Sequence, residues 1–273
     1  MPSEPPQALQ QEVIDAYKRM TQDYDRIIAQ QPFFINCYAL YAKLLDRILD
    51  QRQFERILDV GCGNGNQTVR LARHAKEVIG IDIAEDLMAV ARERCRVFPN
   101  VTIQHEDARK MPFPDASFDC IFSYGDVLSH IIDGYERALA EISRVAKPGA
   151  TISFEVDNKW HLGIFYHPSE LWANLKTPGR GNTARFWEGL HFKTFTRPEL
   201  VGLLDKYHID LLEYHNHNAL AALVPDQYVL EPEGRSLWGR IALALGKIDL
   251  AWSGRFPINR VGFNIMVIAR KRA

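Results

Sequence analysis

Residues 57–66 read ILDVGCGNGN, and the rest of the chain is organised around them. An apolar run ends in the acid Asp59, and glycine then stands at every second position. After Asn66, apolar residues recur at helical spacing, so the stretch is a strand, a tight turn and a helix. Glycine lets the backbone turn sharply and lets a ligand come close, because it has no Cβ. This predicts a nucleotide-sized binding loop at the carboxyl end of the first strand of an α/β sheet.

The kind of nucleotide follows from the residues around the glycines. A dinucleotide fingerprint needs a third glycine at position 66, where this chain has Asn66. A pyrophosphate also avoids a nearby anion, whereas Asp59 stands at the mouth of the loop and suits a ligand with an ammonium group. S-adenosylmethionine has an ammonium group and no phosphate. The run DVGCGNG resembles motif I of the class I S-adenosylmethionine-dependent methyltransferases, which implies that molecule as co-substrate.

Length and composition restrict the remaining choices. With 273 residues, the chain is one large α/β domain or one domain with an appended cap. The formal net charge of -1 implies no bulk attraction to nucleic acid. The 4 cysteines are scattered without pair spacing, which fits a reducing cytoplasm. Neither a stable membrane insertion nor a signal peptide is expected, because no apolar stretch is long enough and the first residues are polar. We expect a cytoplasmic monomer or homodimer.

Alternating strand and helix patterns predict a doubly wound, Rossmann-like α/β sheet of seven strands. The expected strands are 56–60, 78–81, 101–103, 118–122, 151–156, 208–214 and 262–269, and the expected helices after the first strand include 85–97, 133–146 and 198–206. Six strands should be parallel. The resemblance implies that the last two strands form an antiparallel pair, which leaves one antiparallel strand at the sheet edge.

The first 50 residues are expected to form a helical cap on a methyltransferase domain that spans 51–273. Apolar stripes on either side of Pro32 predict two helices. The simpler interpretation packs both helices on the core. In the alternative interpretation, the two helices form a cap that closes over the cofactor, and Tyr17 and Tyr24 face the substrate.

Two long stretches, at about 157–195 and 216–260, interrupt the alternation and are expected to be lids on the substrate side. The first is rich in aromatic residues, and its Trp160 and Trp187 are candidates for substrate contacts. The second carries an apolar stripe at helical spacing. That helix either packs on the sheet or a lid, or lies on a membrane surface and makes weak contact through 235–252.

The resemblance also assigns cofactor residues. Asp82 ends the second strand, where a carboxylate accepts hydrogen bonds from both ribose hydroxyls. Ile83 and Leu87 would then flank the adenine ring, Asp107 would accept from its amino group, and Ala108 would lie beside the ring. The remaining cofactor candidates lie in the glycine loop and at the end of the fourth strand, and they are Asp59, Gly61, Cys62, Gly63 and Ser123.

Catalytic residues are harder to assign. In this fold the end of the fourth strand faces the methyl group, so Tyr124 is a candidate to touch the substrate. His130 follows one turn later and is a candidate general base, because histidine takes a proton most easily near neutral pH. It fits a pocket wall or a core position equally well. His215 and His217 share a strand face, but a metal site needs further ligands and none is evident, so no metal is expected.

The expected activity is methyl transfer to a small, aromatic or lipophilic acceptor, because the inserts are aromatic. Whether oxygen, nitrogen or carbon is methylated stays open. Methyl transfer by in-line displacement mainly requires that the enzyme position the two reactants. The lack of an obvious catalytic dyad is therefore no argument against this activity. Two alternatives are kept. One is a non-catalytic module that binds S-adenosylmethionine. The other is a nicotinamide-dependent oxidoreductase, which Asn66 and the absence of a Tyr-x-x-x-Lys pair disfavour.

Overall fold

The computed structural model describes residues 6–186, 190–232 and 236–273. Its strands are β1 (Phe54–Val60), β2 (Ala75–Asp82), β3 (Val101–His105), β4 (Phe118–Ser123), β5 (Ala146–Asn158), β6 (Thr183–Phe186), β7 (Leu190–Phe195), β8 (Ile209–His217) and β9 (Asn264–Lys271). Each predicted strand is present, and most extend by a few residues. The pair β6–β7, inside the first insert, was not predicted.

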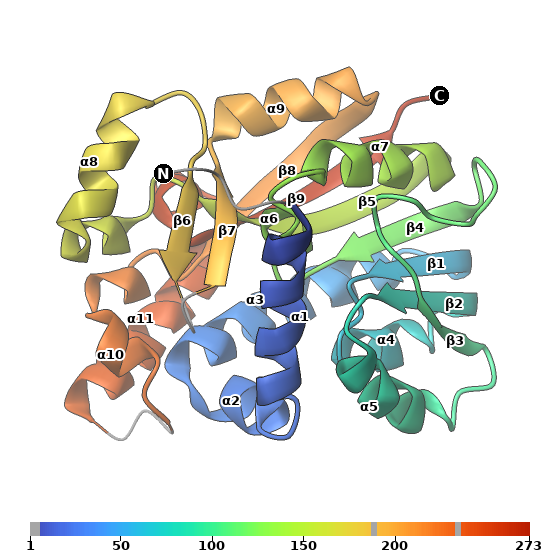
Figure 1. Cartoon of the computed structure of the whole chain (residues 1–273), viewed down its shortest axis with the longest axis horizontal. Helices are drawn as coiled ribbons and strands as arrows, with labels where there is room; N and C mark the ends of the chain where they lie inside the picture. Colours follow the sequence, from blue (N-terminus) through green and yellow to red (C-terminus); the bar gives the residue numbers. More distant parts are fainter. Residues whose placement is uncertain (1–5, 187–189, 233–235) are drawn as a thin grey trace.

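The strands form the predicted mixed sheet (Figure 1). The main order is β3-β2-β1-β4-β5-β9-β8, and β1 to β5 pair in parallel. The antiparallel strand β9 lies between β5 and β8, so the antiparallel pairs stand at one side of the sheet. The sequence-based fold class is therefore confirmed. The hairpin β6–β7 joins the far end of β5 through two parallel pairs, Asp157 with Thr194 and Asn158 with Phe195.

Helices cover both faces of the sheet (Figure 1). They are α1 (Pro6–Met20), α2 (Tyr24–Gln30), α3 (Pro32–Leu49), α4 (Asn66–Leu71), α5 (Glu85–Cys95), α6 (Val127–His130), α7 (Tyr135–Val145), α8 (Pro168–Lys176), α9 (Arg197–Lys206), α10 (Asp226–Val229), α11 (Leu237–Trp252) and α12 (Ile258–Val261), with short 3₁₀ turns at Leu162–Tyr166 and Ala221–Leu223. Helices α7 and α9 pack with the strands in one apolar cluster. Helices α3, α4 and α11 contribute to a second.

The N-terminal region has three helices, so the prediction of two was wrong. The first apolar stripe is divided between α1 and α2 by a turn at residues 21–23. At that turn the Thr21 hydroxyl donates to the carbonyl of Tyr17 at 2.8 Å, and the amide of Asp23 bonds to Met20 at 2.9 Å. Such local bonds compete with a continuous helix. Pro32 begins α3, as expected for a residue without an amide hydrogen. The division of the chain into 1–50 and 51–273 stays a prediction, although α3 is part of the core.

Helix α11 buries only part of the predicted stripe of Trp238, Ile241, Leu245, Ile248 and Trp252, because Ile241 and Leu245 pack, partly buried, against the second apolar cluster. Its buried face is formed by Gly239, Ala242, Gly246 and Asp249. A Cβ at Gly246 would lie 2.0 Å from the side-chain oxygen of Asn36, so the small residues let α11 approach α3 closely. About half of the surface of three stripe residues is exposed: Trp238, Ile248 and Trp252. In the described ranges, we find no helix that is both long and apolar enough to cross a membrane.

Candidate active site

The glycine loop has the backbone geometry that its sequence predicts. Gly61, Gly63 and Gly65 all have positive φ, between 52° and 81°. A Cβ at Gly61 would lie 2.2 Å from a methyl group of Val127, so this position has no room for a side chain. At Gly63, by contrast, a Cβ would meet only Leu87, at 3.9 Å. Gly61 is therefore required by packing as well as by the turn, whereas Gly63 leaves open space beside the loop.

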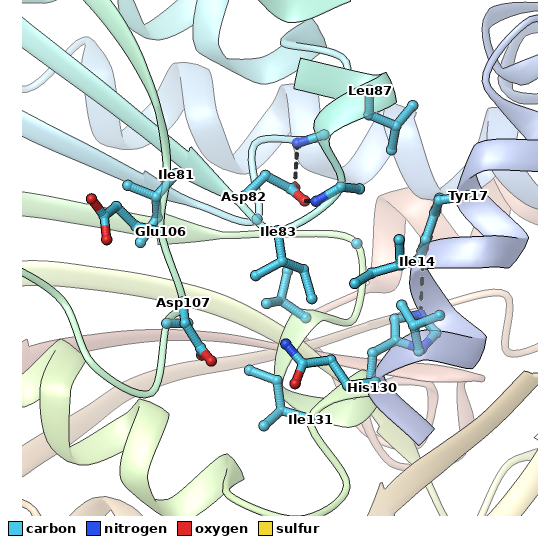
Figure 2. Close-up of a pocket in the computed structure, with 18 of the residues that line it drawn as sticks. Ile14, Tyr17, Ile81, Asp82, Ile83, Leu87, Glu106, Asp107, His130 and Ile131 are labelled. Atoms are coloured by element: carbon cyan, nitrogen blue, oxygen red, sulfur yellow. Dashed lines mark hydrogen bonds between the residues drawn. The ribbon is translucent and has the colours of Figure 1, made fainter. Parts of the chain in front are cut away.

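Asp82 ties two neighbouring loops together at the end of β2. Its Oδ2 accepts from the amide of Gly63 and its Oδ1 from the amide of Ala84, both at 2.8 Å (Figure 2). Burial raises the pKa of Asp82, and the backbone hydrogen bonds oppose that rise. A carboxylate offers about four acceptor positions, so two stay available for hydroxyl groups of a ligand.

A cavity of about 980 Å³, partly open to solvent, lies over these strand ends. Seven predicted cofactor residues line it: Gly61, Gly63, Asp82, Ile83, Leu87, Asp107 and Ala108. Figure 2 shows the apolar side chains of Ile83, Leu87 and Ile131 around the space, with Asp82 and Asp107 at its side. The cavity therefore offers an apolar slot beside carboxylates, which fits a nucleoside.

Three predicted cofactor residues do not line this cavity. Asp59 is buried, and its Oδ2 accepts from the Thr68 hydroxyl at 2.6 Å. Burial raises the pKa of Asp59 to about 6. Cys62 and Ser123 are also buried away from the space. Asp59 therefore does not lie at the ligand side of the glycine loop, where the sequence predicted it to lie. Its side chain supports the loop from the protein interior.

Helix α1 closes one side of the cavity with Gln10, Val13, Ile14 and Tyr17. Arg109 joins this helix to the loop after β3, because its Nη2 donates to Gln10 at 2.6 Å and to Asp107 Oδ2 at 2.6 Å. Burial raises the pKa of Asp107, but the Arg109 bonds outweigh burial and the pKa is lowered overall. Sequence reasoning missed Gln10, Val13, Ile14 and Arg109, because no motif marks a helix that folds back over a loop.

A second cavity, of about 660 Å³, adjoins the first. Its lining is mainly aromatic and comes from widely separated segments: Tyr17, Tyr24, Phe33, Phe34, Cys37, Tyr38, Tyr41, Gly125, Asp126, His130, Asp157, Leu190, Phe192 and Phe263. The two cavities share Tyr17, Tyr24, Gly125 and His130. These four residues form the common wall, at the end of β4.

His130 lies in this common wall. Its Nε2 is 3.4 Å from the Tyr17 hydroxyl (Figure 2), and its Nδ1 is buried without a protein partner. Burial lowers the pKa of His130 to about 4, so the ring is neutral at pH 7 and a weak base. Tyr124 reaches the first cavity, but its hydroxyl bonds to the Ser153 hydroxyl at 2.8 Å inside the sheet. Burial raises the pKa of Tyr124 well above its usual range. These positions favour His130 over Tyr124 for contact with a substrate.

The other candidates are distributed differently. Tyr17 and Tyr24 line both cavities, with ring centres 6.1 Å apart. Trp160 lines neither cavity and donates to the carbonyl of Pro178. Trp187 lies outside the described residues. The first insert reaches the second cavity instead through Leu190 and Phe192, while the described part of 216–260 contributes to neither lining.

The two histidines on β8 have protein partners. The Nε2 of His217 lies 2.5 Å from Glu155 Oε1, and the Nε2 of His215 lies 2.8 Å from Glu213 Oε2. The second oxygen of Glu155 accepts from the amide of Gly125 at 3.0 Å and from the Tyr41 hydroxyl. Among residues 6–186, 190–232 and 236–273, no three or more His, Cys, Asp or Glu side chains are grouped to hold a metal ion.

The sheet order and the cavity over the β1 and β2 ends define a Rossmann-like protein that binds a nucleoside-containing ligand. Comparison with known proteins identifies its family. A model described as a methyltransferase domain matches residues 57–149. A demethylmenaquinone methyltransferase of Staphylococcus aureus (strain JH9) is 31% identical over 198 residues, which are 70% of this chain and 80% of that protein. The chain therefore belongs to the class I S-adenosylmethionine-dependent methyltransferases, and S-adenosylmethionine is its co-substrate.

Solved structures share the fold at lower identity. The 1,6-didemethyltoxoflavin-N1-methyltransferase of Burkholderia thailandensis has a TM-score of 0.61 and 16% identity, over 100% of this chain and 93% of that chain. An S-adenosylmethionine-dependent methyltransferase of Methanosarcina mazei has a TM-score of 0.55 and 22% identity, over 81% of this chain and 93% of that chain. Family membership also removes the oxidoreductase alternative.

Proposed function

We propose that the chain methylates a flat aromatic or quinone-type small molecule that binds in the second cavity. The observation that carries this proposal is the shared wall of Tyr17, Tyr24, Gly125 and His130, which puts an aromatic cavity directly beside the cofactor cavity. Aromatic walls favour flat, apolar ligands through burial and ring contacts. The relatives named demethylmenaquinone methyltransferases support the same class of acceptor.

The site residues would act by positioning. Bound S-adenosylmethionine supplies a methyl group on a sulfonium, which already has a good leaving group. In our proposal Asp82 holds the ribose, Ile83, Leu87 and Ala108 hold the adenine, and Asp107 accepts from its amino group. Holding two reactants in line can contribute about 7–11 kcal/mol of the barrier.

Helix α11 and the segment after it expose large apolar side chains outside the two cavities. Leu237, Trp238, Ile248, Trp252 and Phe256 are all substantially exposed. Such side chains suit weak contact with a membrane surface, which we propose for 235–252. Sedimentation with phosphatidylglycerol vesicles checks this. Retention should fall when Trp238 and Trp252 are both changed to Ser, and equal retention would contradict it.

The acceptor is best identified by a screen that does not assume its chemical class. The protein is incubated with methyl-labelled S-adenosylmethionine and a metabolite extract, and the labelled product is identified. Demethylmenaquinone is added in a parallel reaction. The proposal expects label in an aromatic or quinone-type product, and label only in sugars, amino acids or macromolecules would contradict it.

A further inference from the structure

Two carboxyl groups face the second cavity, and the mechanism above does not use them. Asp126 follows β4 and Asp157 lies in β5, and both line the cavity. A single amide nitrogen, Nδ2 of Asn264, donates to Asp126 Oδ1 at 2.7 Å and to Asp157 Oδ1 at 3.2 Å. Asn264 is 1% exposed and Asp157 is 6% exposed. Asp126 is partly buried, so the three side chains form one hydrogen-bonded group, with both acids lining a mainly aromatic cavity.

The backbone at Asp126 supports a functional role. Its φ is +59°, in the left-handed region that residues other than glycine rarely adopt. Asp126 also begins α6, and its carbonyl accepts from the amide of His130 at 3.0 Å. Strained positions of this kind cluster at active sites. The turn directs the Asp126 carboxyl toward the acceptor cavity rather than the cofactor cavity, whose lining does not include it.

The surroundings of the pair contain little positive charge. Besides the pair itself, the titratable side chains in the cavity or acting on the pair are Tyr17 of α1, Tyr24 of α2, Cys37, Tyr38 and Tyr41 of α3, His130 of α6, Glu155 of β5 and Glu170 of α8. His130 is neutral at pH 7. Within the described ranges, neither Asp126 nor Asp157 forms an ion pair with a lysine or arginine. Two negative charges in such a place repel each other, which favours a proton on one of the two carboxyl groups over two ionised groups.

Burial, the charge of Asp157 and the charge of Glu155 raise the pKa of Asp126 well above its usual range. Burial and Glu155 do the same to the pKa of Asp157. A pair that holds one proton can donate one hydrogen bond and accept another. That combination matches a hydroxyl group on an aromatic ring. An ammonium group fits less well, because a buried carboxylate stabilises its charged form, which cannot attack a methyl group.

We propose that Asp126 and Asp157 bind the ring hydroxyl of a hydroxyaromatic acceptor and remove its proton during methyl transfer. This deepens the proposed function and rests on it. The O–H bond breaks, the proton passes to the ionised carboxylate, and the electron pair stays on the acceptor. The acceptor then bonds to the methyl carbon while the methyl–sulfur bond breaks, with its electron pair going to sulfur. If a ring carbon is methylated, that carbon afterwards loses its own proton to water.

The test uses the full chain with Asp126 and Asp157 both changed to Asn, and with each changed alone. Turnover is measured with 1-naphthol, whose hydroxyl is protonated at neutral pH, and with 2-hydroxy-1,4-naphthoquinone, which is already ionised there. We expect kcat for 1-naphthol to fall at least about 100-fold in the double variant, as for loss of a general base. With the ionised acceptor the loss should be under about tenfold. Equal losses for both acceptors, or none, would overturn the proposal.

Controls separate chemistry from misfolding. Affinity for S-adenosylmethionine and the melting temperature show whether the variants are folded. Asp210→Asn is the matched control, because Asp210 is a carboxylate of β8 that pairs with Arg272 and lines neither cavity. It should keep wild-type turnover. Methylation of 1-naphthylamine in preference to 1-naphthol, with the same rate in wild type and double variant, would point to an amine acceptor and also overturn the proposal.

One measurement does not need an acceptor. Infrared spectra of the resting protein at pH 7 should contain a protonated carboxyl band that is lost in the double variant. Absence of this band from the wild-type spectrum would overturn the proposal that the pair holds a proton. Failure of the proposed function looks different, because the wild type would then methylate none of the naphthalene compounds while the infrared band is still present.

Discussion

The two cavities of this protein differ in how the chain builds them. The cofactor cavity is centred on the loops that follow β1, β2 and β3, and α1, Tyr24 and the segment after β4 complete its lining. The acceptor cavity collects side chains from α1, α2, α3, the turn after β4, α6, β5, β7 and the residue before β9. A site built from local turns can be found in sequence, whereas a site built from distant side chains depends on the whole fold.

The largest loss of cofactor affinity is expected from the substitution Gly61→Ala. The new Cβ would clash with Val127 at 2.2 Å and would sit at a φ of +74°. We expect affinity for S-adenosylmethionine, measured by calorimetry, to fall at least about 100-fold, since overpacking and backbone strain each cost about 1–3 kcal/mol. Gly149→Ala is the matched control, because Gly149 has a φ of +80° and open space around it. Equal effects of the two changes would mean that backbone strain alone is responsible.

A smaller effect is expected from Asp82→Ala. The change removes the acceptor for the Gly63 and Ala84 amides and, in our proposal, for the ribose hydroxyls. Affinity for S-adenosylmethionine should fall at least about tenfold, because hydrogen bonds to a charged acceptor contribute about 1.5–3 kcal/mol. Asp59→Asn, which alters a buried carboxyl outside the cavity, should change affinity less than about threefold. Unchanged affinity in Asp82→Ala would contradict the ribose assignment.

On the acceptor side, Phe192→Ala should separate the two cavities. Phe192 lines only the second one. We expect the acceptor KM to rise about tenfold, as for loss of roughly 1.4 kcal/mol of apolar contact, while cofactor affinity stays the same. Phe165→Ala is the control, because Phe165 lies in the same insert but is 67% exposed. A matching loss of cofactor affinity in Phe192→Ala would show that the cavities are not independent.

The smallest effect on the cofactor side should come from His130→Ala, although His130 is part of the common wall. Its 3.4 Å contact with Tyr17 is long for a hydrogen bond, so little binding energy is lost. Calorimetry should give an affinity for S-adenosylmethionine within about threefold of the wild type. A collapse of cofactor binding would instead make His130 a structural part of the first cavity.

The contrast between the cavities also explains what could be predicted from sequence. The sheet, the glycine loop and Asp82 follow from local patterns: apolar runs, positive-φ glycines and an acid at a strand end. The turn between α1 and α2 was missed because helical spacing continues across it, and only packing reveals the break. The buried face of α11 was missed because Gly239 and Gly246 have no side chain to continue an apolar pattern and Asp249 is charged. Asp126 and Asp157, 31 positions apart, meet only because β4 and β5 are neighbours in the sheet.

The most direct test of the two-cavity arrangement is a crystal structure of the chain with S-adenosylhomocysteine. We predict the ribose against Asp82, the adenine between Ile83, Leu87 and Ala108, and the sulfur directed toward Gly125 and His130 in the common wall. A sulfur atom that points away from this wall, or a nucleoside bound outside the first cavity, would contradict the account.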